Sequence, residues 1–156
     1  METEKSIEAL NTLIQINNDR IEGYETASKE TDEHDLKTMF AELAQTSHTC
    51  HRELVSEVNR LGGTPTEGTK ITGKFFRVWM DVKAALTGKN RKAILNSCEF
   101  GEDKAVETYS DVLKDDSEHL SAELQTIVRA QHVLIKADHD KVKSLRDAAG
   151  ETQSTN

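Results

Sequence analysis

The stretch EHDLKTMFAELAQTSHTCHRELVSEVNRLGGTP, residues 33–65, decides the fold class because it holds one complete helix and its stop signal. Apolar residues recur in it at intervals of three and four, which places them on one helical face. They are Leu36, Met39, Phe40, Leu43, Cys50, Leu54, Val58 and Leu61. Gly62 and Gly63 then end the helix, because glycine accepts the left-handed conformation that closes a helix, and Pro65 prevents its continuation.

The same spacing predicts further helices on both sides of this one. The predicted helices cover about residues 4–29, 33–61, 73–86, 91–114 and 117–149. Thr31 and Asp32 separate the first two, and Asp115, Asp116 and Ser117 offer caps for the last. The chain has one proline and no run typical of a strand, so we predict an all-α protein.

The connections between the predicted helices decide the architecture. The first two long helices are joined by a tight turn, as are the last two, while residues 62–90 and a short helix packed through Trp79 separate the two hairpins. A four-helix bundle with one long crossover has ferritin-like topology. We therefore expect one ferritin-like domain over residues 1–149 and a polar, disordered tail over 150–156. An ordinary five-helix bundle without a crossover is the alternative.

Composition limits the classes of function. Lys and Arg total 20 and Asp and Glu total 28, so the net charge of −8 disfavours binding to nucleic acid or to an anionic membrane. No apolar run is long enough to span a bilayer, and the N-terminal residues lack the layout of a signal peptide, so we expect a cytoplasmic protein. In that compartment Cys50 and Cys98 are expected to be free, buried thiols.

Several polar side chains fall within or beside the predicted apolar faces, where an uncompensated charge would be costly. They are Asn17, Asn18, Glu22, Glu25, Ser47, His48, His51, Glu102, Gln131, Asp138 and His139. A rise of about 1.5 Å per residue divides them into two layers. Glu102 and Gln131 share the first layer with the two asparagines and the histidines of the second helix. The other layer holds Glu25, Asp138 and His139.

Two hypotheses explain these residues. The first is a site for iron or manganese inside the bundle, built from carboxylates and imidazoles. Its candidate ligands are Glu22, Glu25, His51, Glu102 and His139. The second is a buried polar network in which Asn18, Gln131 and Asp138 hydrogen-bond one another and fix the helix register. The di-iron motif Glu-x-x-His occurs nowhere in the sequence, which favours the network.

Several motifs run in order along nearly the whole chain. They are NNDRIEGY at residues 17–24, GGTP at 62–65, GKFFRVWMDVK at 73–83, IL at 94–95, EFGED at 99–103, Tyr109, HD at 139–140 and LR at 145–146. Together they resemble an uncharacterised bacterial ferritin-like family, a domain of unknown function. The resemblance implies a four-helix bundle with a short helix in its long connection, and it implies no established activity. It draws attention to Glu22, Glu102 and His139.

The sequence shows no Ser or Cys nucleophile together with a base and an orienting acid, so it favours no enzyme class. We expect a non-enzymatic bundle protein, a homodimer or larger, with a stress-related or interaction role. The first alternative is a metal-binding ferritin-like protein that oxidises ferrous iron. The second alternative is a binder of small ligands that uses the polar layers as its pocket.

Overall fold

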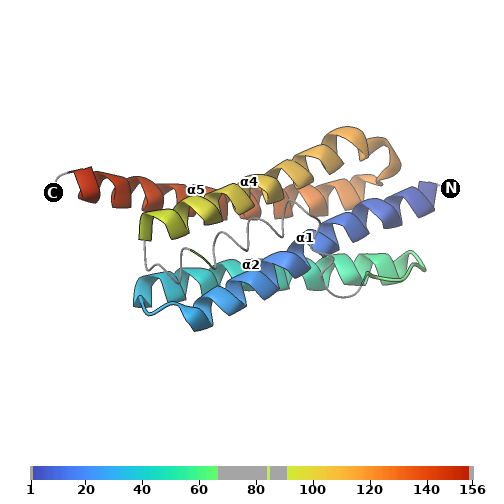
Figure 1. Cartoon of the computed structure of the whole chain (residues 1–156). Helices are drawn as coiled ribbons and strands as arrows, with labels where there is room; N and C mark the ends of the chain where they lie inside the picture. Colours follow the sequence, from blue (N-terminus) through green and yellow to red (C-terminus); the bar gives the residue numbers. More distant parts are fainter. Residues whose placement is uncertain (1, 67–83, 85–90, 155–156) are drawn as a thin grey trace.

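The computed structural model describes residues 2–66, 84 and 91–154, and these residues form helices and turns without strands (Figure 1). The described helices are α1 (Glu2–Glu30), α2 (His34–Arg60), α4 (Arg91–Asp115), the short 3-10 helix η1 (Ser117–His119) and α5 (Ala122–Ser154). The prediction of an all-α helical bundle is confirmed. The short helix predicted over 73–86, with Trp79, lies outside the described residues except for Ala84.

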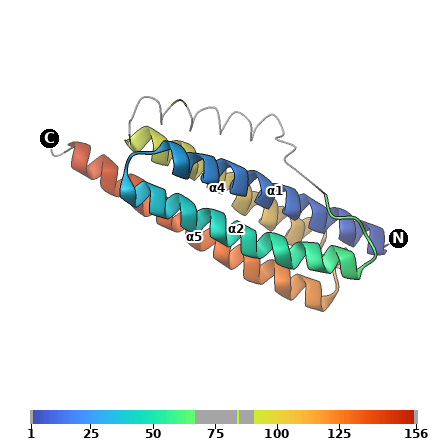
Figure 2. The ribbon, with the colours of Figure 1, turned by 90° about the horizontal axis from the view of Figure 1, so that it is seen from below.

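The four long helices form two antiparallel hairpins that lie side by side (Figures 1 and 2). α1 packs along α2 and α4 packs along α5, and the hairpins meet through α1 with α4 and through α2 with α5. α2 ends beside the N-terminus (Figure 1). α4 begins at the opposite end, where Arg91 pairs with Glu33, at 3.3 Å, and with Asp35. The connection from α2 to α4 therefore joins opposite ends of the bundle.

The ends of two helices follow from local chemistry. Gly62 has a left-handed φ of 82°, and the Gly63 N–H donates to the Val58 carbonyl at 3.0 Å, which is the geometry of a glycine-closed helix. At the start of α5 the Ser121 hydroxyl accepts the Leu124 N–H at 3.1 Å, so Ser121 is the cap rather than the acidic residues before it. α5 continues to Ser154, beyond its predicted end at Ala149.

Two apolar clusters fill the core on either side of a polar middle. One cluster lies near the α1–α2 turn, where the Tyr24 and Phe40 rings stack with their centroids 5.9 Å apart. The other lies near the N-terminal end of the bundle and includes Leu10, Leu54 and Val128. Burial of each large apolar side chain contributes about 1.5–3 kcal/mol. These clusters position the polar residues between them.

Candidate functional site

A buried arginine occupies the middle of the bundle. Arg20 on α1 is 1% exposed, and Glu102 on α4 is fully buried. Arg20 donates from Nε to Glu102 Oε2 at 2.9 Å and from Nη2 to Glu102 Oε1 at 2.8 Å, which makes a bidentate pair. It also donates to Ser47 Oγ on α2 at 2.6 Å and to Asp138 Oδ2 on α5 at 3.3 Å. One guanidinium therefore connects all four long helices, and we call these four residues the arginine layer.

The charges of the arginine layer compensate one another. Burial alone would lower the pKa of Arg20, but the negative charge of Glu102 and the other neighbours outweigh it, so the pKa is raised and the side chain stays protonated. Burial raises the pKa of Asp138, and the Arg20 charge partly opposes that rise. The Arg20 guanidinium also lies 5.5 Å from the centre of the Tyr24 ring, a favourable cation–π position.

A second polar layer lies toward the N-terminal end of the bundle. Asn17 donates to the Tyr109 hydroxyl at 2.8 Å, and that hydroxyl donates to Gln131 Oε1 at 2.7 Å. Gln131 then donates to Glu53 Oε1 at 2.8 Å and to the Cys50 carbonyl at 3.3 Å. This tyrosine layer also links all four long helices, this time through mostly neutral hydrogen bonds.

The membership of the two layers differs from the predicted one. Asp138 joins Glu102 in the arginine layer, whereas Gln131 belongs to the tyrosine layer. Of the two neighbouring asparagines on α1, Asn17 is buried and Asn18 is only half-buried. Sequence reasoning missed Arg20 altogether, although it lies on the same face of α1 as the buried residues Leu13, Asn17 and Tyr24.

The predicted ligands on the first hairpin lie at or near the surface. Glu22 and Glu25 are exposed, and Glu25 pairs with His48 at 2.6 Å. His51 is half-buried, and burial lowers its pKa, with a smaller effect from His48. Ile7 and Ile21 are only half-buried, and they extend the apolar spacing of α1 toward the side of Glu25, which is why the sequence indicates an inward position for this glutamate.

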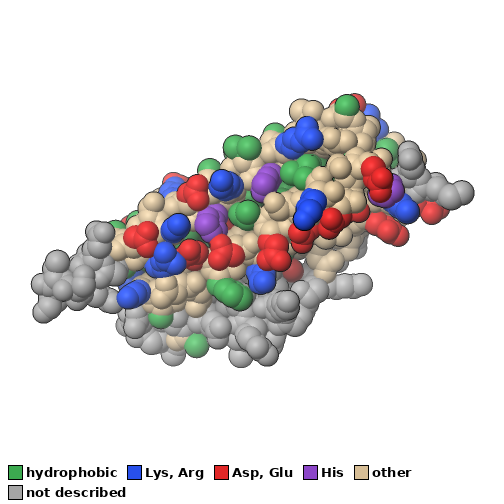
Figure 3. Space-filling model, turned by 90° about the horizontal axis from the view of Figure 1, so that it is seen from above, with side chains coloured by type: hydrophobic (Ala, Val, Ile, Leu, Met, Phe, Trp, Pro, Cys, Tyr) green, Lys and Arg blue, Asp and Glu red, His purple; other side chains and the backbone are tan. Residues whose placement is uncertain are grey.

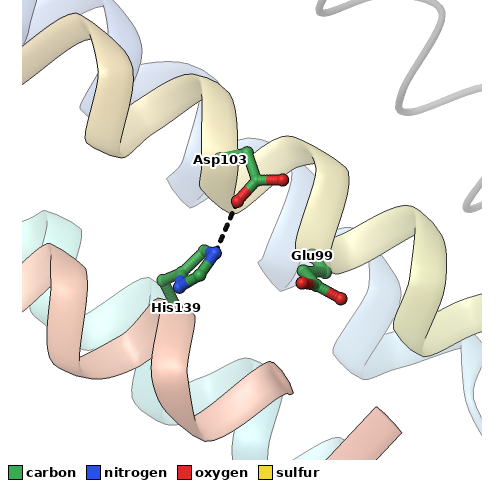
Figure 4. A group of neighbouring side chains, drawn as sticks. All are labelled: Glu99, Asp103 and His139. Atoms are coloured by element: carbon green, nitrogen blue, oxygen red, sulfur yellow. Dashed lines mark hydrogen bonds and ion pairs between the residues drawn. The ribbon is translucent and has the colours of Figure 1, made fainter. Parts of the chain in front are cut away.

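His139 lies on the seam between α4 and α5, away from Glu102. Its Nε2 is 2.5 Å from Asp103 Oδ1 (Figure 4). Its Nδ1 is 3.2 Å from Asp140 Oδ1. Burial opposes protonation, but the hydrogen bonds to Asp140 and Asp103 outweigh it and raise the pKa of His139. Glu99 lies one turn from Asp103 on α4 and pairs with Arg146.

Asp19 on α1 has a buried carboxyl, one oxygen of which has no hydrogen-bond partner among the described residues. Asp19 is 4% exposed, and its Oδ1 accepts no hydrogen bond. Burial, with a smaller contribution from Glu22, raises the pKa of Asp19 to about 7. Asp19 therefore changes its charge within the neutral pH range.

The buried residues of the interior differ from the carboxylate and imidazole site expected from the sequence. Both carboxylate oxygens of Glu102 are bound by Arg20, so a divalent ion there would lie beside a permanent cation. The five predicted ligands also do not converge, since Glu22 and Glu25 are exposed and His139 contacts Asp103 at the seam. Arg20 therefore lies between the carboxylates of Glu102 on α4 and Asp138 on α5.

Fold and site together define an all-α helical bundle protein with ionic and hydrogen-bonded layers in its interior. Among its described helices, none combines the length and the apolar character needed to cross a membrane. The chain belongs to the family described as Domain of unknown function (DUF2383), whose model matches residues 5–115. This range includes Arg20, Glu102 and Tyr109 and ends before α5. No curated protein matches the chain.

Proposed function

We propose that the protein is a ferritin-like four-helix bundle that acts without an interior metal, as a non-enzymatic interaction protein. The positions of α2 and α4 support the ferritin-like topology, because the first ends and the second begins at opposite ends of the bundle, so that the two helices run parallel. The observation that carries the functional part is the bidentate pair of Arg20 and Glu102. A cytoplasmic, stress-related setting belongs to the same proposal.

The arginine layer performs the structural task that a metal performs in a carboxylate-lined bundle. A guanidinium offers fixed donors and one positive charge to carboxylates from neighbouring helices. It has no redox state and no open coordination position, so it holds the helices without supplying chemistry. Glu102 and Asp138 approach it from α4 and α5, and Ser47 approaches it from α2. The layer thus fixes the helix register and leaves the outer surface for contacts with partners.

Metal analysis tests this proposal directly. Untagged protein and the variant Glu102→Gln are each incubated with ferrous iron, manganese and zinc, and bound metal per chain is measured after gel filtration. We expect Glu102→Gln to bind as much metal as the unchanged protein, because Glu102 is committed to Arg20. Circular dichroism verifies that the variant is folded. Loss of about one or more metal ions per chain on Glu102→Gln, with loss of ferrous oxidation, would contradict an interior without metal.

Self-association is part of the proposal. Phe100 on α4 and Val133 and Leu134 on α5 are 53%, 67% and 46% exposed. Figure 3 shows that hydrophobic side chains on one face of the molecule form separate spots among charged groups. A homodimer through the outer faces of α4 and α5 would then have apolar anchors within a polar surround, which is the usual anatomy of an interface.

Sedimentation should show a dimer in the unchanged protein. Its dissociation constant should rise by about tenfold or more when Phe100 and Val133 are both replaced by glutamate, because two apolar anchors would be lost. The matched control adds two glutamates at Thr38 and Gln45, which are exposed on α2. This control changes the net charge equally and should leave the dimer intact. A monomer at high concentration in the unchanged protein, or equal weakening by both double variants, would contradict this interface.

A further inference from the structure

We propose that the seam between α4 and α5 binds one divalent first-row transition-metal ion through Glu99, Asp103 and His139. Within the described residues these three side chains can bring ligand atoms to within 4.8 Å of one another. The proposal goes beyond the interaction role argued above, since it concerns the outer seam and not the interior. It also uses Glu99 and Asp103, which were not among the predicted ligands.

The backbone already presents the three ligands to one point. Glu99 and Asp103 are four residues apart on α4, so their side chains leave the same face of the helix one turn apart. His139 reaches them from the antiparallel neighbour α5 (Figure 4). Metal–ligand bonds of about 2.0–2.2 Å place neighbouring ligand atoms about 3 Å apart, so rotation of side chains suffices to close the site.

The histidine is oriented as metal-binding histidines are. Its Nδ1 lies 3.2 Å from Asp140 Oδ1. In many metal sites a carboxylate outside the ligand set contacts the imidazole in this way and leaves Nε2 for the metal. Nε2 in turn lies 2.5 Å from Asp103 Oδ1, so the imidazole and this carboxylate already face one another across the seam. A divalent ion placed between the same two atoms would be bound by both of them.

Glu99 is the ligand that must change its partner. Its carboxylate pairs with Arg146, which also pairs with Asp147 at 2.8 Å. Arg146 therefore keeps an anionic partner when Glu99 turns toward the metal. One imidazole and two carboxylates suit Zn²⁺, Fe²⁺ and Mn²⁺, and the usual order of affinities places Zn²⁺ above Mn²⁺. Three protein ligands leave at least one coordination position for water.

Calorimetric titration of the untagged full chain with zinc chloride, and separately with manganese chloride, tests the site. We expect one ion per chain and tighter binding of Zn²⁺ than of Mn²⁺. His139→Gln and Asp103→Asn should each weaken Zn²⁺ binding by about tenfold or more. Arg146→Gln should tighten it, because Glu99 no longer has a competing cation.

His48→Gln is the matched control, because His48 forms an exposed pair with Glu25 and is not part of such a three-ligand group among the described residues. It should bind Zn²⁺ as the unchanged protein does. No saturable binding, or equal losses in His139→Gln and His48→Gln, would overturn the seam site. Asp103 is exposed, so Asp103→Asn keeps the test valid if His139→Gln does not fold. If Glu102→Gln loses Zn²⁺ binding and His139→Gln keeps it, both the seam site and the metal-free interior are overturned. If both variants keep Zn²⁺ binding, only the seam site is overturned.

Discussion

Replacing Arg20 with methionine should lower the free energy of unfolding by about 3–5 kcal/mol, because Glu102 would stay buried without its partner. Methionine has a similar length and fills much of the space of the arginine side chain. The loss of stability therefore reports the missing charge rather than a cavity. Urea unfolding followed by circular dichroism measures it. The matched control is Glu25→Gln, which breaks the exposed pair with His48 and should cost no more than about 1 kcal/mol.

A double variant separates the ion pair from the rest of the packing. When Arg20→Met is combined with Glu102→Leu, neither a buried charge nor an unpaired carboxylate remains in that pair, although Asp138 and Ser47 lose one partner each. We expect the double variant to be more stable than Arg20→Met alone, as is found when both members of a buried pair become apolar. A loss below about 1 kcal/mol for Arg20→Met, or a double variant that loses the sum of both single effects, would contradict the arginine layer.

Asp19→Asn should stabilise the protein at alkaline pH and remove part of its pH dependence. The folded pKa of Asp19 is about 7, above its ordinary value of 3.8, so the folded chain holds this proton more tightly than the unfolded chain does. The contribution to stability is therefore fully present below about pH 4 and is lost as the pH rises through about 7. Asparagine carries no charge at any pH, so the variant avoids this loss.

The measurement is the free energy of unfolding of both proteins at about pH 4.5 and about pH 8. Relative to the unchanged protein, Asp19→Asn should gain about 1–2 kcal/mol between these values, less than the full pKa shift would give because solvent screens part of the effect. Asp111→Asn, at an exposed position of α4, is the control and should show no such gain. A gain that is equal at both pH values would show that Asp19 does not titrate near neutrality.

The helices could be predicted because spacing and stop signals are local. The apolar spacing of α2 and the Gly62–Gly63 stop set its length within a residue or so of the structure, His34–Arg60. Arg20 could not be placed by the same reasoning, since a long basic side chain is buried only when distant carboxylates meet it. Its partners Glu102 and Asp138 come from the other hairpin. The one local signal was its position on the same face as Asn17 and Tyr24.

The seam between α4 and α5 was hidden for a different reason. The pairing of Asp103 with His139 depends on the register of two antiparallel helices, and that register depends on the turn between them. The prediction began the last helix at about residue 117, whereas Ser121 caps α5 after the short helix η1. An error of that size rotates and shifts every side chain of α5 relative to α4. Glu102, in contrast, was identified as buried because it follows the apolar spacing of its own helix.

The arginine layer also bears on how the chain reaches its native state. Each hairpin can form from contacts between neighbours in the sequence, but the pairing of Arg20 with Glu102 exists only after the hairpins dock. Until then the guanidinium stays hydrated, and a hairpin made in isolation would expose its apolar face around a charge that has no partner. The two hairpins should therefore unfold together in a single transition, so that a destabilising substitution in either hairpin lowers the stability of the whole chain.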